Sequence, residues 1–444
     1  MLAELPCLKA VLFNPTPCCC TAGVVFISLR WIISVDALTT VAHPLCESEN
    51  EMATASNFIV VGVHRTFIMQ VLLAIHSFTR ANCVVICPGH IRYLHLSNMC
   101  SKILFIELNE DNENAFTEAV NQCAQMVPSP ILISVDCEST RIVNKVRRQL
   151  RVTTARAPDN AMLELFDNKW RFYDFCKQNN LNVPSTQLVP SKNELNFLAV
   201  VREIGLPFIL KPLDQHGAEG VRLILSEKHY SETILGDDRY DFKPLLAQRF
   251  IRGVDIGLNI LSILGKVQAL AIQYRAYPQN EEAKISFIPN SYLEIAARIL
   301  CGSSGYDGVM NVDARLEEGS GKVYLFEANP RYWVSLSASV WCGLNFLSEN
   351  LKSSYRSSEV RLLTSGKADT FYHPLFRPVF WPYILFDYGW RGRMARLMAG
   401  NVCTLGNQVR TTLKNGFKKN LPPGVPTPNH SVWTNQSGST KRTS

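Results

Sequence analysis

Short apolar runs that alternate with amphipathic segments between residues 57 and 150 restrict the fold of this chain more than any other feature. The runs are continuously apolar, which is typical of strands buried on both faces of a parallel sheet. We expect strands at residues 57–63, 83–87, 103–107 and 130–135, and helices at 66–80, 112–126 and 139–150. Strands and helices in this order predict an α/β fold, with a Rossmann-like domain over residues 52–157.

The turn after the first expected strand lacks the glycine pattern of dinucleotide-binding domains. That pattern is G-x-G-x-x-G, in which glycines let the backbone approach a pyrophosphate. Here Gly62 stands alone. We therefore do not expect this domain to bind a dinucleotide.

The sequence pattern changes at about residue 158, and from there on it predicts an α+β domain. Asp167 is the expected N-cap of a helix in which Lys169 lies early. Gly265 and Lys266 are expected to form a hairpin turn between two strands. The strands are expected at residues 208–212, 221–225, 245–251, 256–264, 309–316 and 322–327.

The polar residues of this second domain suit a site for magnesium and a nucleotide. Lys169 lies early in a helix, and Lys211 ends a strand that is followed by a turn with Gly217 and Gly220. Lysine side chains neutralise phosphate oxygens, and glycine lets backbone N–H groups approach them. A set of Asp, Glu and Asn residues follows later in the chain, and hard oxygen ligands of this kind can hold Mg²⁺ beside a nucleotide. The set consists of Asp255, Asp313, Glu327 and Asn329.

Two segments in this order resemble the ATP-grasp superfamily, in particular its carbamoyl-phosphate-synthase-like carboxylate ligases. The first is Phe208-Ile-Leu-Lys-Pro212 followed by Gly217-Ala-Glu-Gly-Val221. The second is Gly305-Tyr-Asp-Gly-Val-Met-Asn-Val-Asp313, which runs into Phe326-Glu-Ala-Asn-Pro-Arg331. The resemblance covers about residues 159–351 and implies a two-lobed ATP-grasp domain over 158–351, with a lid at about 183–247. The Rossmann-like domain is its expected companion.

The resemblance also implies roles for individual residues. Lys169 and Lys211 would contact phosphates, Gln248 would face the adenine amino group, and Asp255 would hold the ribose hydroxyls. Arg331 would stabilise the transferred phosphoryl group or the substrate carboxylate, which with Lys211 makes the expected catalytic pair. The phosphate-covering loop would include Gly217, Ala218, Gly220 and Val221, the adenine hinge would be Arg249, Phe250 and Ile251, and the metal ligands would be Asp313, Glu327 and Asn329.

Two departures from the family pattern matter. Ala218 and Glu219 stand where many relatives have Ser and a basic or small residue, and Glu219 is unfavourable beside phosphates unless it points to solvent. Val334 stands where carbamoyl phosphate synthases have a second arginine. The second departure weakens the case for carbamoyl phosphate as the product.

The function that the resemblance implies is an ATP-dependent ligase with Mg²⁺, or Mn²⁺ in its place. The enzyme would activate a small-molecule carboxylate as an acyl phosphate for attack by an amine or a similar nucleophile. Two alternatives share every nucleotide-binding residue and stay open. They are a small-molecule kinase and a non-enzymatic nucleotide-binding protein.

The basic charge of the chain is confined to its C-terminal part. The formal net charge is +7, yet residues 377–444 alone hold ten Lys and Arg against one acid, Asp387. No nucleic-acid-binding module accompanies this charge, so a nucleic-acid partner is not expected. Within the C-terminal region 352–420, aromatic and basic residues gather at 376–396. This segment would either pack on the catalytic domain or make weak contact with a membrane surface.

The remaining segments predict little structure of their own. Charges interrupt the apolar stretch at residues 22–42, so we expect residues 1–51 to be an extension outside any domain. Residues 421–444 are rich in Pro, Ser, Thr and Asn and are expected to be disordered. The 14 cysteines contain no C-x-x-C pair, which indicates reduced thiols and a cytoplasmic protein.

Overall fold

The computed structural model describes residues 57–215, 219–276, 284–352, 359–369, 373–402 and 405. All of these described residues belong to one compact unit. The expectations for residues 1–51, for 421–444, and for Gly217 and Ala218 lie outside the described residues. Within the described part, no helix is both long and apolar enough to cross a membrane.

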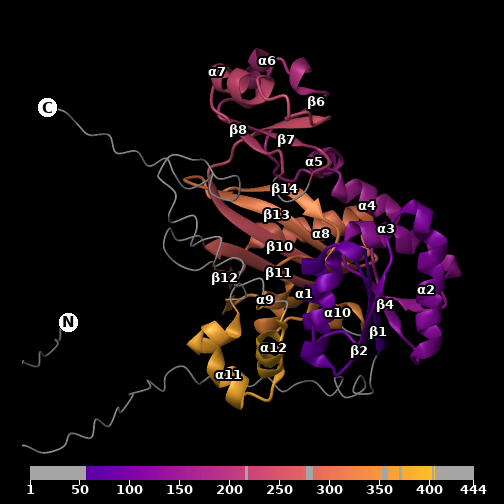
Figure 1. Ribbon diagram of the computed structural model, residues 1–444. Helices are drawn as coiled ribbons and strands as arrows, with labels where there is room; N and C mark the ends of the chain where they lie inside the picture. The colour runs from indigo at the N-terminus through magenta and orange to yellow at the C-terminus, as the bar shows by residue number, and fades with distance from the viewer. Residues whose placement is uncertain are drawn as a thin grey trace, which may run out of the picture. The chain divides into compact units, whose positions relative to one another are not determined.

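The expected parallel sheet is present at the start of this unit (Figure 1). Its five strands lie in the order β3-β2-β1-β4-β5, and every pairing between them is parallel. The strands are β1 (Asn57–Val61), β2 (Asn82–Cys87), β3 (Lys102–Phe105), β4 (Ile131–Ser134) and β5 (Thr153–Thr154). The helices between them are α1 (Arg65–Phe78), α2 (Glu113–Met126) and α3 (Cys137–Val146).

Alternate residues of β1 explain why its apolar run is continuous. Side chains of a strand point to opposite faces of the sheet in turn. Ile59 and Val61 enter a core with Phe116 of α2 and Val143 of α3, whereas Val60 enters the core on the side of α1. Both faces of the sheet are therefore covered, as the sequence predicts.

A four-stranded antiparallel sheet forms the expected lid. Its order is β6-β9-β7-β8, with β6 (Thr186–Val189), β7 (Phe208–Pro212), β8 (Arg222–Ile224) and β9 (Leu245–Arg249). Helices α6 (Phe197–Ile204) and α7 (Glu227–Tyr230) cover one face (Figure 1). Phe208 and Leu210 enter the core on that face, so Ile209 and Lys211 lie on the other face.

A seven-stranded sheet forms the second lobe, with the order β14-β13-β10-β11-β12-β16 and β15 beside β11. Its long strands are β10 (Gly253–Ile263), β11 (Lys266–Ala276), β13 (Gly308–Glu317) and β14 (Val323–Asn329), and its short ones are β12 (Lys284–Phe287), β15 (Arg361–Leu363) and β16 (Gly366–Ala368). Helices α4 (Asn160–Asp167), α5 (Lys169–Gln178) and α8 (Ser291–Ser304) pack with one face of it. The sequence analysis did not predict α8, β12, β15 or β16.

The expected N-cap of α5 was wrong by one residue. Asn168 is the N-cap, and its Oδ1 accepts the backbone N–H groups of Trp170 and Arg171 at 3.1 and 3.0 Å. Asp167 is the last residue of α4 and accepts a hydrogen bond from Arg141 at 2.7 Å. Both residue types cap helices well. The break between α4 and α5 falls at Asn168, whose backbone is extended.

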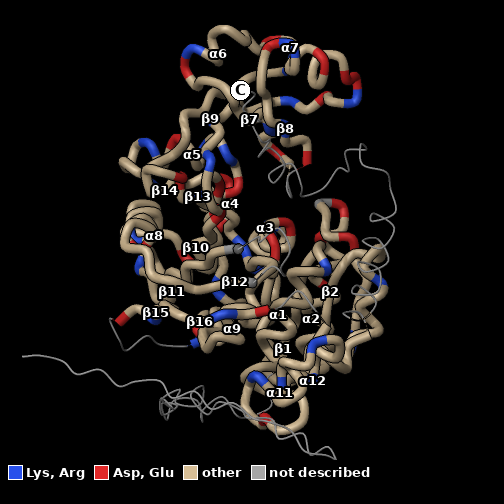
Figure 2. Tube along the Cα trace, turned by 90° about the vertical axis from the view of Figure 1, so that its left-hand side faces the viewer, with Lys and Arg blue, Asp and Glu red and all other residues tan. Residues whose placement is uncertain are grey.

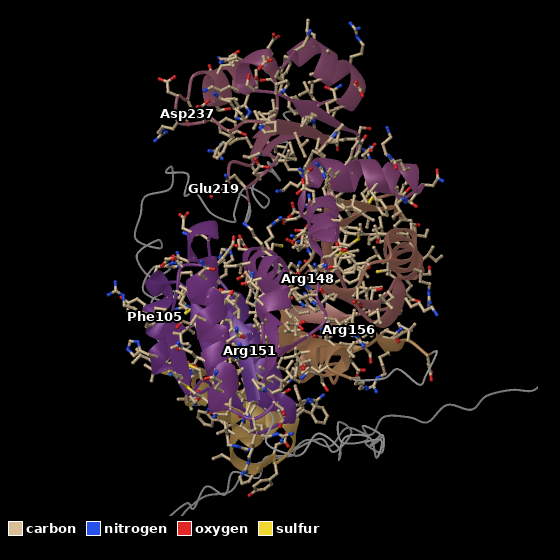
Figure 3. The ribbon with its side chains drawn as sticks, turned by 90° about the vertical axis from the view of Figure 1, so that its right-hand side faces the viewer. Phe105, Arg148, Arg151, Arg156, Glu219 and Asp237 are labelled. Carbon is tan, nitrogen blue, oxygen red and sulfur yellow. The ribbon has the colours of Figure 1, made fainter. Side chains whose placement is uncertain are left out.

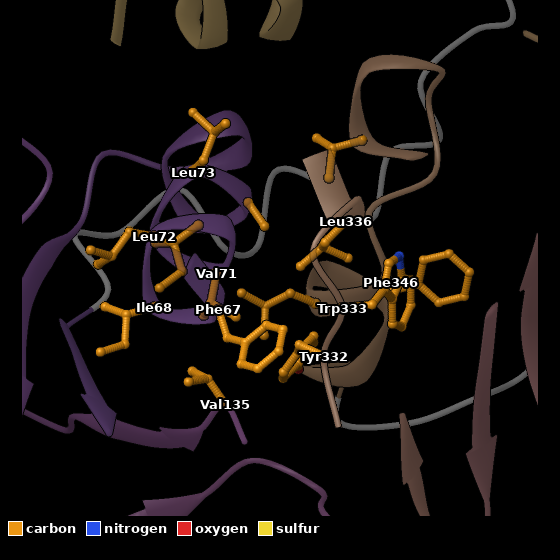
Figure 4. Close-up of a cluster of buried hydrophobic side chains, with 14 of the residues drawn as sticks. Phe67, Ile68, Val71, Leu72, Leu73, Val135, Tyr332, Trp333, Leu336 and Phe346 are labelled. Carbon is orange, nitrogen blue, oxygen red and sulfur yellow. The ribbon is translucent and has the colours of Figure 1, made fainter. Parts of the chain in front are cut away.

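The C-terminal helices join the seven-stranded sheet to the Rossmann-like domain. They are α9 (Leu336–Trp341), α10 (Phe346–Asn350), α11 (Trp381–Phe386) and α12 (Trp390–Ala399). Figure 4 shows Phe67 and Leu72 of α1 in the same buried cluster as Trp333 and Phe346. Gln70 on α1 also accepts the backbone N–H of Ser337 at 2.7 Å. The two domains therefore share one hydrophobic core.

Candidate active site

Lys211 is the buried cation of the site. It lies at the end of β7 on the face opposite α6 and α7, and its side chain is 7% exposed. The pKa of Lys211 is lowered to about 8, chiefly by burial and in smaller part by the nearby Lys169, while the Glu327 and Asp313 carboxylates act in the opposite direction. A lysine of the lid thus faces two carboxylates of the seven-stranded sheet.

Lys169, the first residue of α5, is also buried. Its Nζ donates to the carbonyl oxygens of Leu213 and Gln215 at 2.9 and 2.7 Å. These carbonyls belong to the segment that leads from β7 into the glycine turn. The two lysines expected to contact phosphates therefore lie close together, and Lys169 also holds the base of the turn.

The described part of the glycine turn contains a residue in the left-handed conformation that favours glycine. Gly220 has a φ of +69°, and a Cβ there would come within 2.5 Å of the Pro212 ring. Glu219 is exposed (Figure 3), which satisfies the condition that its charge points to solvent. Val221 follows half-buried. A side chain larger than hydrogen does not fit at Gly220 without moving the turn.

The residues expected around the adenine lie on or next to β9. Gln248 is 3% exposed, and its Nε2 donates to Thr186 Oγ1 on β6 at 2.9 Å. Gln248 pairs with Ile209 in the sheet and so shares the face of Lys211. Arg249 forms an ion pair with Glu317 at 3.3 Å. The amide group of Gln248 is therefore fixed on the lid face that carries Lys211.

The other expected nucleotide contacts follow β9. The N–H of Phe250 donates to the Pro207 carbonyl at 3.4 Å, and Ile251 is buried. The Ile251 carbonyl accepts a hydrogen bond from Arg315 at 3.0 Å. Arg315 Nε also donates to Asp255 Oδ1 at 2.7 Å. A ribose at Asp255 would share that carboxylate with Arg315.

The three expected metal ligands lie together on β13 and β14. Asp313 and Glu327 are directly opposite each other in the sheet, and Asn329 Nδ2 donates to Asp313 Oδ2 at 3.1 Å. Within the described residues, no group of three or more His, Cys, Asp and Glu side chains could hold a metal ion. Two carboxylates and an amide oxygen fit Mg²⁺, which takes one or two protein carboxylates and completes its shell with waters and phosphate oxygens.

A row of buried amides behind the metal ligands escaped the sequence analysis. Asn311 donates to Asn259 Oδ1 at 2.9 Å, and Asn259 donates to Gln273 Oε1 at 3.3 Å. Asn329 extends the row with a 3.4 Å bond to Asn311, and Gly257 leaves room for the Gln273 side chain. The asparagines within otherwise apolar strands could have indicated this row from the sequence. The row fixes the side chains that flank Asp313.

Arg331 lies directly after the strand that carries two of the expected metal ligands, Glu327 and Asn329. It donates to Asn329 Oδ1 at 2.8 Å and to the Tyr332 carbonyl at 3.1 Å. Its guanidinium lies over the Phe67 ring of α1, with 4.3 Å between Cζ and the ring centre. The expected acceptor-binding arginine therefore stands where the Rossmann-like domain meets the seven-stranded sheet.

Comparison with known proteins identifies this arrangement. Residues 166–335 match the family model of the ATP-grasp domain. The chain therefore carries an ATP-grasp domain. No curated protein sequence matches the chain.

Solved structures resemble both domains together. The L-amino acid ligase from Bacillus licheniformis is 18% identical, with a TM-score of 0.52 over 69% of this chain and 77% of that one. The biotin carboxylase domain of Hydrogenobacter thermophilus 2-oxoglutarate carboxylase, solved with MgADP, ADP and bicarbonate, is 16% identical with a TM-score of 0.53. That match covers 68% of this chain and 71% of that one. These likenesses show that the chain shares its fold with those two proteins.

The sequence analysis missed the residues that face the ATP-grasp domain from the Rossmann-like sheet. Asp136, fully buried, accepts the N–H groups of Val63 and His64 at 2.7 and 3.1 Å and caps α3 through Ser139. His64 lies 3.6 Å from Glu138, whose hydrogen bond raises the pKa of His64 above its usual value. The capping pattern Asp136-x-x-Ser139 could have indicated, from the sequence, the turn between β4 and α3.

These missed residues lie at the point where the order of the parallel strands reverses. The chain passes from β1 to β2 and β3 on one side, and β4 lies on the other side of β1. In open α/β sheets, ligands bind outside the carboxyl ends of the strands at such a point. His64 and Phe67 follow β1, Glu138 follows β4, and Arg331 lies over Phe67.

A hollow opens beside the N-terminal end of α5. It has a volume of about 330 Å³. Its lining is polar and consists of Arg141, Glu164, Asp167, Asn168, Leu213 and Asp214. The lining includes Leu213, whose carbonyl accepts a hydrogen bond from Lys169, so this hollow borders one of the two lysines expected to contact phosphates.

Proposed function

We propose that this protein is an ATP- and magnesium-dependent ligase that joins a small-molecule carboxylate to an amine or a similar nucleophile. The ATP-grasp domain supports ATP as the source of energy. The solved structures that the chain resembles include an L-amino acid ligase and an N5-carboxyaminoimidazole ribonucleotide synthetase. The match to the synthetase has a TM-score of 0.52 at 11% identity and covers 71% of this chain and 80% of that one. For the two substrates we propose only the chemical classes, a carboxylate and an amine.

One observation carries the proposal. A buried lysine of the lid, Lys211, faces Asp313 and Glu327 across the site, and both carboxylates raise its pKa. Triphosphate oxygens need cations on one side and metal-bearing carboxylates on the other. Burial of the Lys211 ammonium group costs free energy, because burial disfavours the charged form. A bound triphosphate would offset that cost.

The proposed roles of the side chains follow from this arrangement of lysine and carboxylates. Lys211 and Lys169 neutralise phosphate oxygens, while Gln248 and Asp255 hold the base and the ribose. Asp313, Glu327 and Asn329 would bind Mg²⁺, which neutralises charge on the β- and γ-phosphates. Phosphoryl transfer needs mainly such positioning and charge neutralisation from a protein.

The reaction has two steps. An oxygen of the acceptor carboxylate attacks the γ-phosphorus, the bond to ADP breaks, and an acyl phosphate forms. The amine then attacks the acyl carbon, phosphate leaves, and the amine gives up a proton. Arg331 binds the acceptor carboxylate, because its planar fork can contact a carboxylate and a phosphoryl oxygen together.

The acceptor binds beside Arg331, in front of the carboxyl ends of β1 and β4. Arg331 lies over the Phe67 ring, and the ring of His64 packs edge-on with that of Phe67, with 5.6 Å between ring centres. Both residues come from the Rossmann-like domain. This domain would thus help to select the acceptor, and Val334, which is 45% exposed, adds no second cation there.

We also propose a cytoplasmic location. The cysteines that the structure describes as free thiols are Cys83, Cys87, Cys100, Cys123, Cys137, Cys176, Cys301 and Cys342. Free thiols persist in a reducing compartment.

Product analysis tests the proposed reaction. The purified chain is incubated with MgATP and a panel of amino acids, other carboxylates and amines, and ADP, phosphate and new amides are measured. We expect ADP and free phosphate in equal amounts, with an amide product, for at least one pair. ADP with a phosphorylated product and no free phosphate would instead identify a kinase. ATP binding without turnover on the panel would favour the non-enzymatic alternative.

A further inference from the structure

His64 and Glu138 form a pair at the edge of the parallel sheet where β1 and β4 end. His64 follows β1, and Glu138 lies in the first turn of α3, which follows β4. The Nε2 atom of His64 lies 3.6 Å from Oε1 of Glu138. Figure 2 shows Asp and Glu residues, in red, at α3. The two side chains are 53% and 41% exposed, so both are accessible to a small molecule.

The backbone segments that carry this pair lie close together and are firmly held. Gly62 lies between β1 and His64, and a Cβ there would come within 2.4 Å of Val135 Cγ2, so glycine permits the close approach of the two turns. Asp136 is fully buried, accepts the backbone N–H of His64 at 3.1 Å and also caps α3. One buried carboxylate thus fixes both the turn that carries His64 and the helix that carries Glu138.

The pairing decides which nitrogen of His64 can take up a proton. A carboxylate accepts hydrogen bonds and does not donate them, so Glu138 favours the neutral imidazole with its hydrogen on Nε2. The lone pair of that ring then lies on Nδ1. Among the described residues, the Nδ1 atom has no hydrogen-bond partner. Nδ1 is therefore available to a bound molecule.

The charged groups that act on His64 come from α3 and from the segment after β14. The hydrogen bond to Glu138 raises the pKa of His64 above its usual value, and the charge of Asp136 acts in the same direction. Burial and the charge of Arg331 lower this pKa, but they do not cancel the rise. A carboxylate that orients an imidazole and stabilises its protonated form is the arrangement found in general bases.

His64 lies beside the residue proposed to bind the acceptor. The His64 ring packs edge-on with the Phe67 ring at 5.6 Å between ring centres, and the Arg331 guanidinium lies over the same Phe67 ring. Arg331 would hold the carboxylate whose carbon becomes the acyl phosphate. An amine that attacks this carbon would therefore arrive near His64, and it must give up a proton as the amide forms.

We propose that His64 is the general base of the second step and that Glu138 positions it. The Nδ1 atom takes a proton from the amine while the amine nitrogen forms its bond to the acyl carbon. The bond from that carbon to the phosphate oxygen breaks, and phosphate leaves with the electron pair. The imidazolium then passes its proton to water. The inference rests on the ligase reaction proposed above and assigns the proton that this reaction releases.

Two nucleophiles separate this role from the first step of the reaction. The probes are MgATP, the common amino acids as both carboxylates and amines, and hydroxylamine. Hydroxylamine is unprotonated at neutral pH and traps an acyl phosphate as a hydroxamate, so it needs no base before it attacks. His64→Asn should keep hydroxamate formation near that of the unchanged protein and lower amide formation about 100- to 10,000-fold. Asparagine removes the base and is a favourable N-cap, the position that His64 occupies on α1.

The pH profile of amide formation identifies the group. The rate should rise with pH through the pKa of His64, because the neutral ring accepts the proton. Glu138→Gln removes the carboxylate that raises this pKa, so the rise should move to lower pH and the plateau should be lower. Glu232→Gln in the lid is the matched control, because it breaks an exposed ion pair of similar length, 3.7 Å to Lys228. The ionisation of the amine is the same for every variant, so a difference between profiles belongs to the protein.

The outcomes distinguish this inference from the reaction on which it rests. Amide formation by His64→Asn at the rate of the unchanged protein would overturn the inference alone, and so would a profile that Glu138→Gln leaves in place. Equal loss of hydroxamate and amide in His64→Asn would place His64 in the first step instead. No hydroxamate from the unchanged protein with any amino acid would overturn the ligase reaction on this panel, and the inference with it. Melting temperature and ATP affinity of each variant establish that it is folded.

Discussion

The guanidinium of Arg331 lies over the ring of Phe67, with 4.3 Å between Cζ and the ring centre. Arg331 follows Glu327 and Asn329, which we propose as metal ligands, and Phe67 lies in the first turn of α1 in the Rossmann-like domain. Because 264 residues separate the two positions, only the packing of the domains brings them together. The contact positions the arginine that we propose binds the acceptor.

Phe67→Leu should weaken acceptor binding and leave ATP binding unchanged. The variant removes the aromatic face, which is worth about 0.5–2 kcal/mol to a cation, so we expect the acceptor KM to rise roughly 2- to 30-fold. Phe67→Tyr, which keeps the ring, is the control. Steady-state kinetics and nucleotide titration measure both constants. An unchanged KM would mean that Phe67 does not orient Arg331 for the acceptor.

Arg331→Lys should keep ATP affinity near that of the unchanged protein and lower the turnover rate by roughly two orders of magnitude or more. Lysine preserves the charge but loses the planar fork, and the interaction matters chiefly in the transition state. Single-turnover ADP formation measures the chemical step. Near-normal turnover of the lysine variant would mean that the acceptor is held elsewhere.

ATP affinity should depend on pH through Lys211. Burial lowers the pKa of this lysine to about 8, so the free protein holds the ammonium form below pH 8 and loses it above. Because phosphate binds the protonated form, affinity should be full below pH 8 and fall up to about tenfold per pH unit above it. Titrations from pH 6.5 to 9.5 check this.

Two variants make the test of Lys211 specific. Lys211→Ala should bind ATP weakly at every pH and show no step near pH 8. Lys177→Ala, which changes an exposed lysine of α5, should behave like the unchanged protein. A step that persists in Lys211→Ala would assign the titration to another group.

Glu327→Gln should abolish turnover while leaving recognition of the base largely intact. The substitution removes one of the two carboxylates proposed to hold Mg²⁺ and does not touch the adenine hinge. Glu327 also raises the pKa of Lys211, so its loss should move the pH step of ATP binding below pH 8. Nucleotide titrations with and without Mg²⁺ and a turnover assay measure these effects, and normal turnover at saturating Mg²⁺ would remove Glu327 from the site.

Asn259→Leu should destabilise the fold by about 1–3 kcal/mol, because it leaves Asn311 Nδ2 without its 2.9 Å acceptor in a buried place. Urea unfolding measures the free energy. The double variant Asn259→Leu, Asn311→Leu should lose less than the sum of the two single variants, since it removes both partners. Strict additivity would contradict a direct interaction between the two amides.

The sequence by itself determined the order and type of most elements. The continuous apolar runs required a parallel sheet covered on both faces, and β1, β2 and β4 are those runs. Local chemistry also marked the site, because Lys211 at a strand end and the pair Glu327 and Asn329 two residues apart occupy positions that periodicity predicts. The roles of these residues toward ATP and Mg²⁺ stay predictions.

Tertiary structure decided what surrounds them. The capping residue of α5 is Asn168 and not Asp167. Both residue types cap helices well, so the residue types alone do not determine where the break between α4 and α5 falls. The amide row depends on the register of β10, β11 and β13, which places Asn259 opposite Asn311. Phe67 and Arg331 meet only because α1 and the ATP-grasp domain share a core. Short-range periodicity carries no information about contacts between such distant positions, and these contacts set the geometry of the acceptor side.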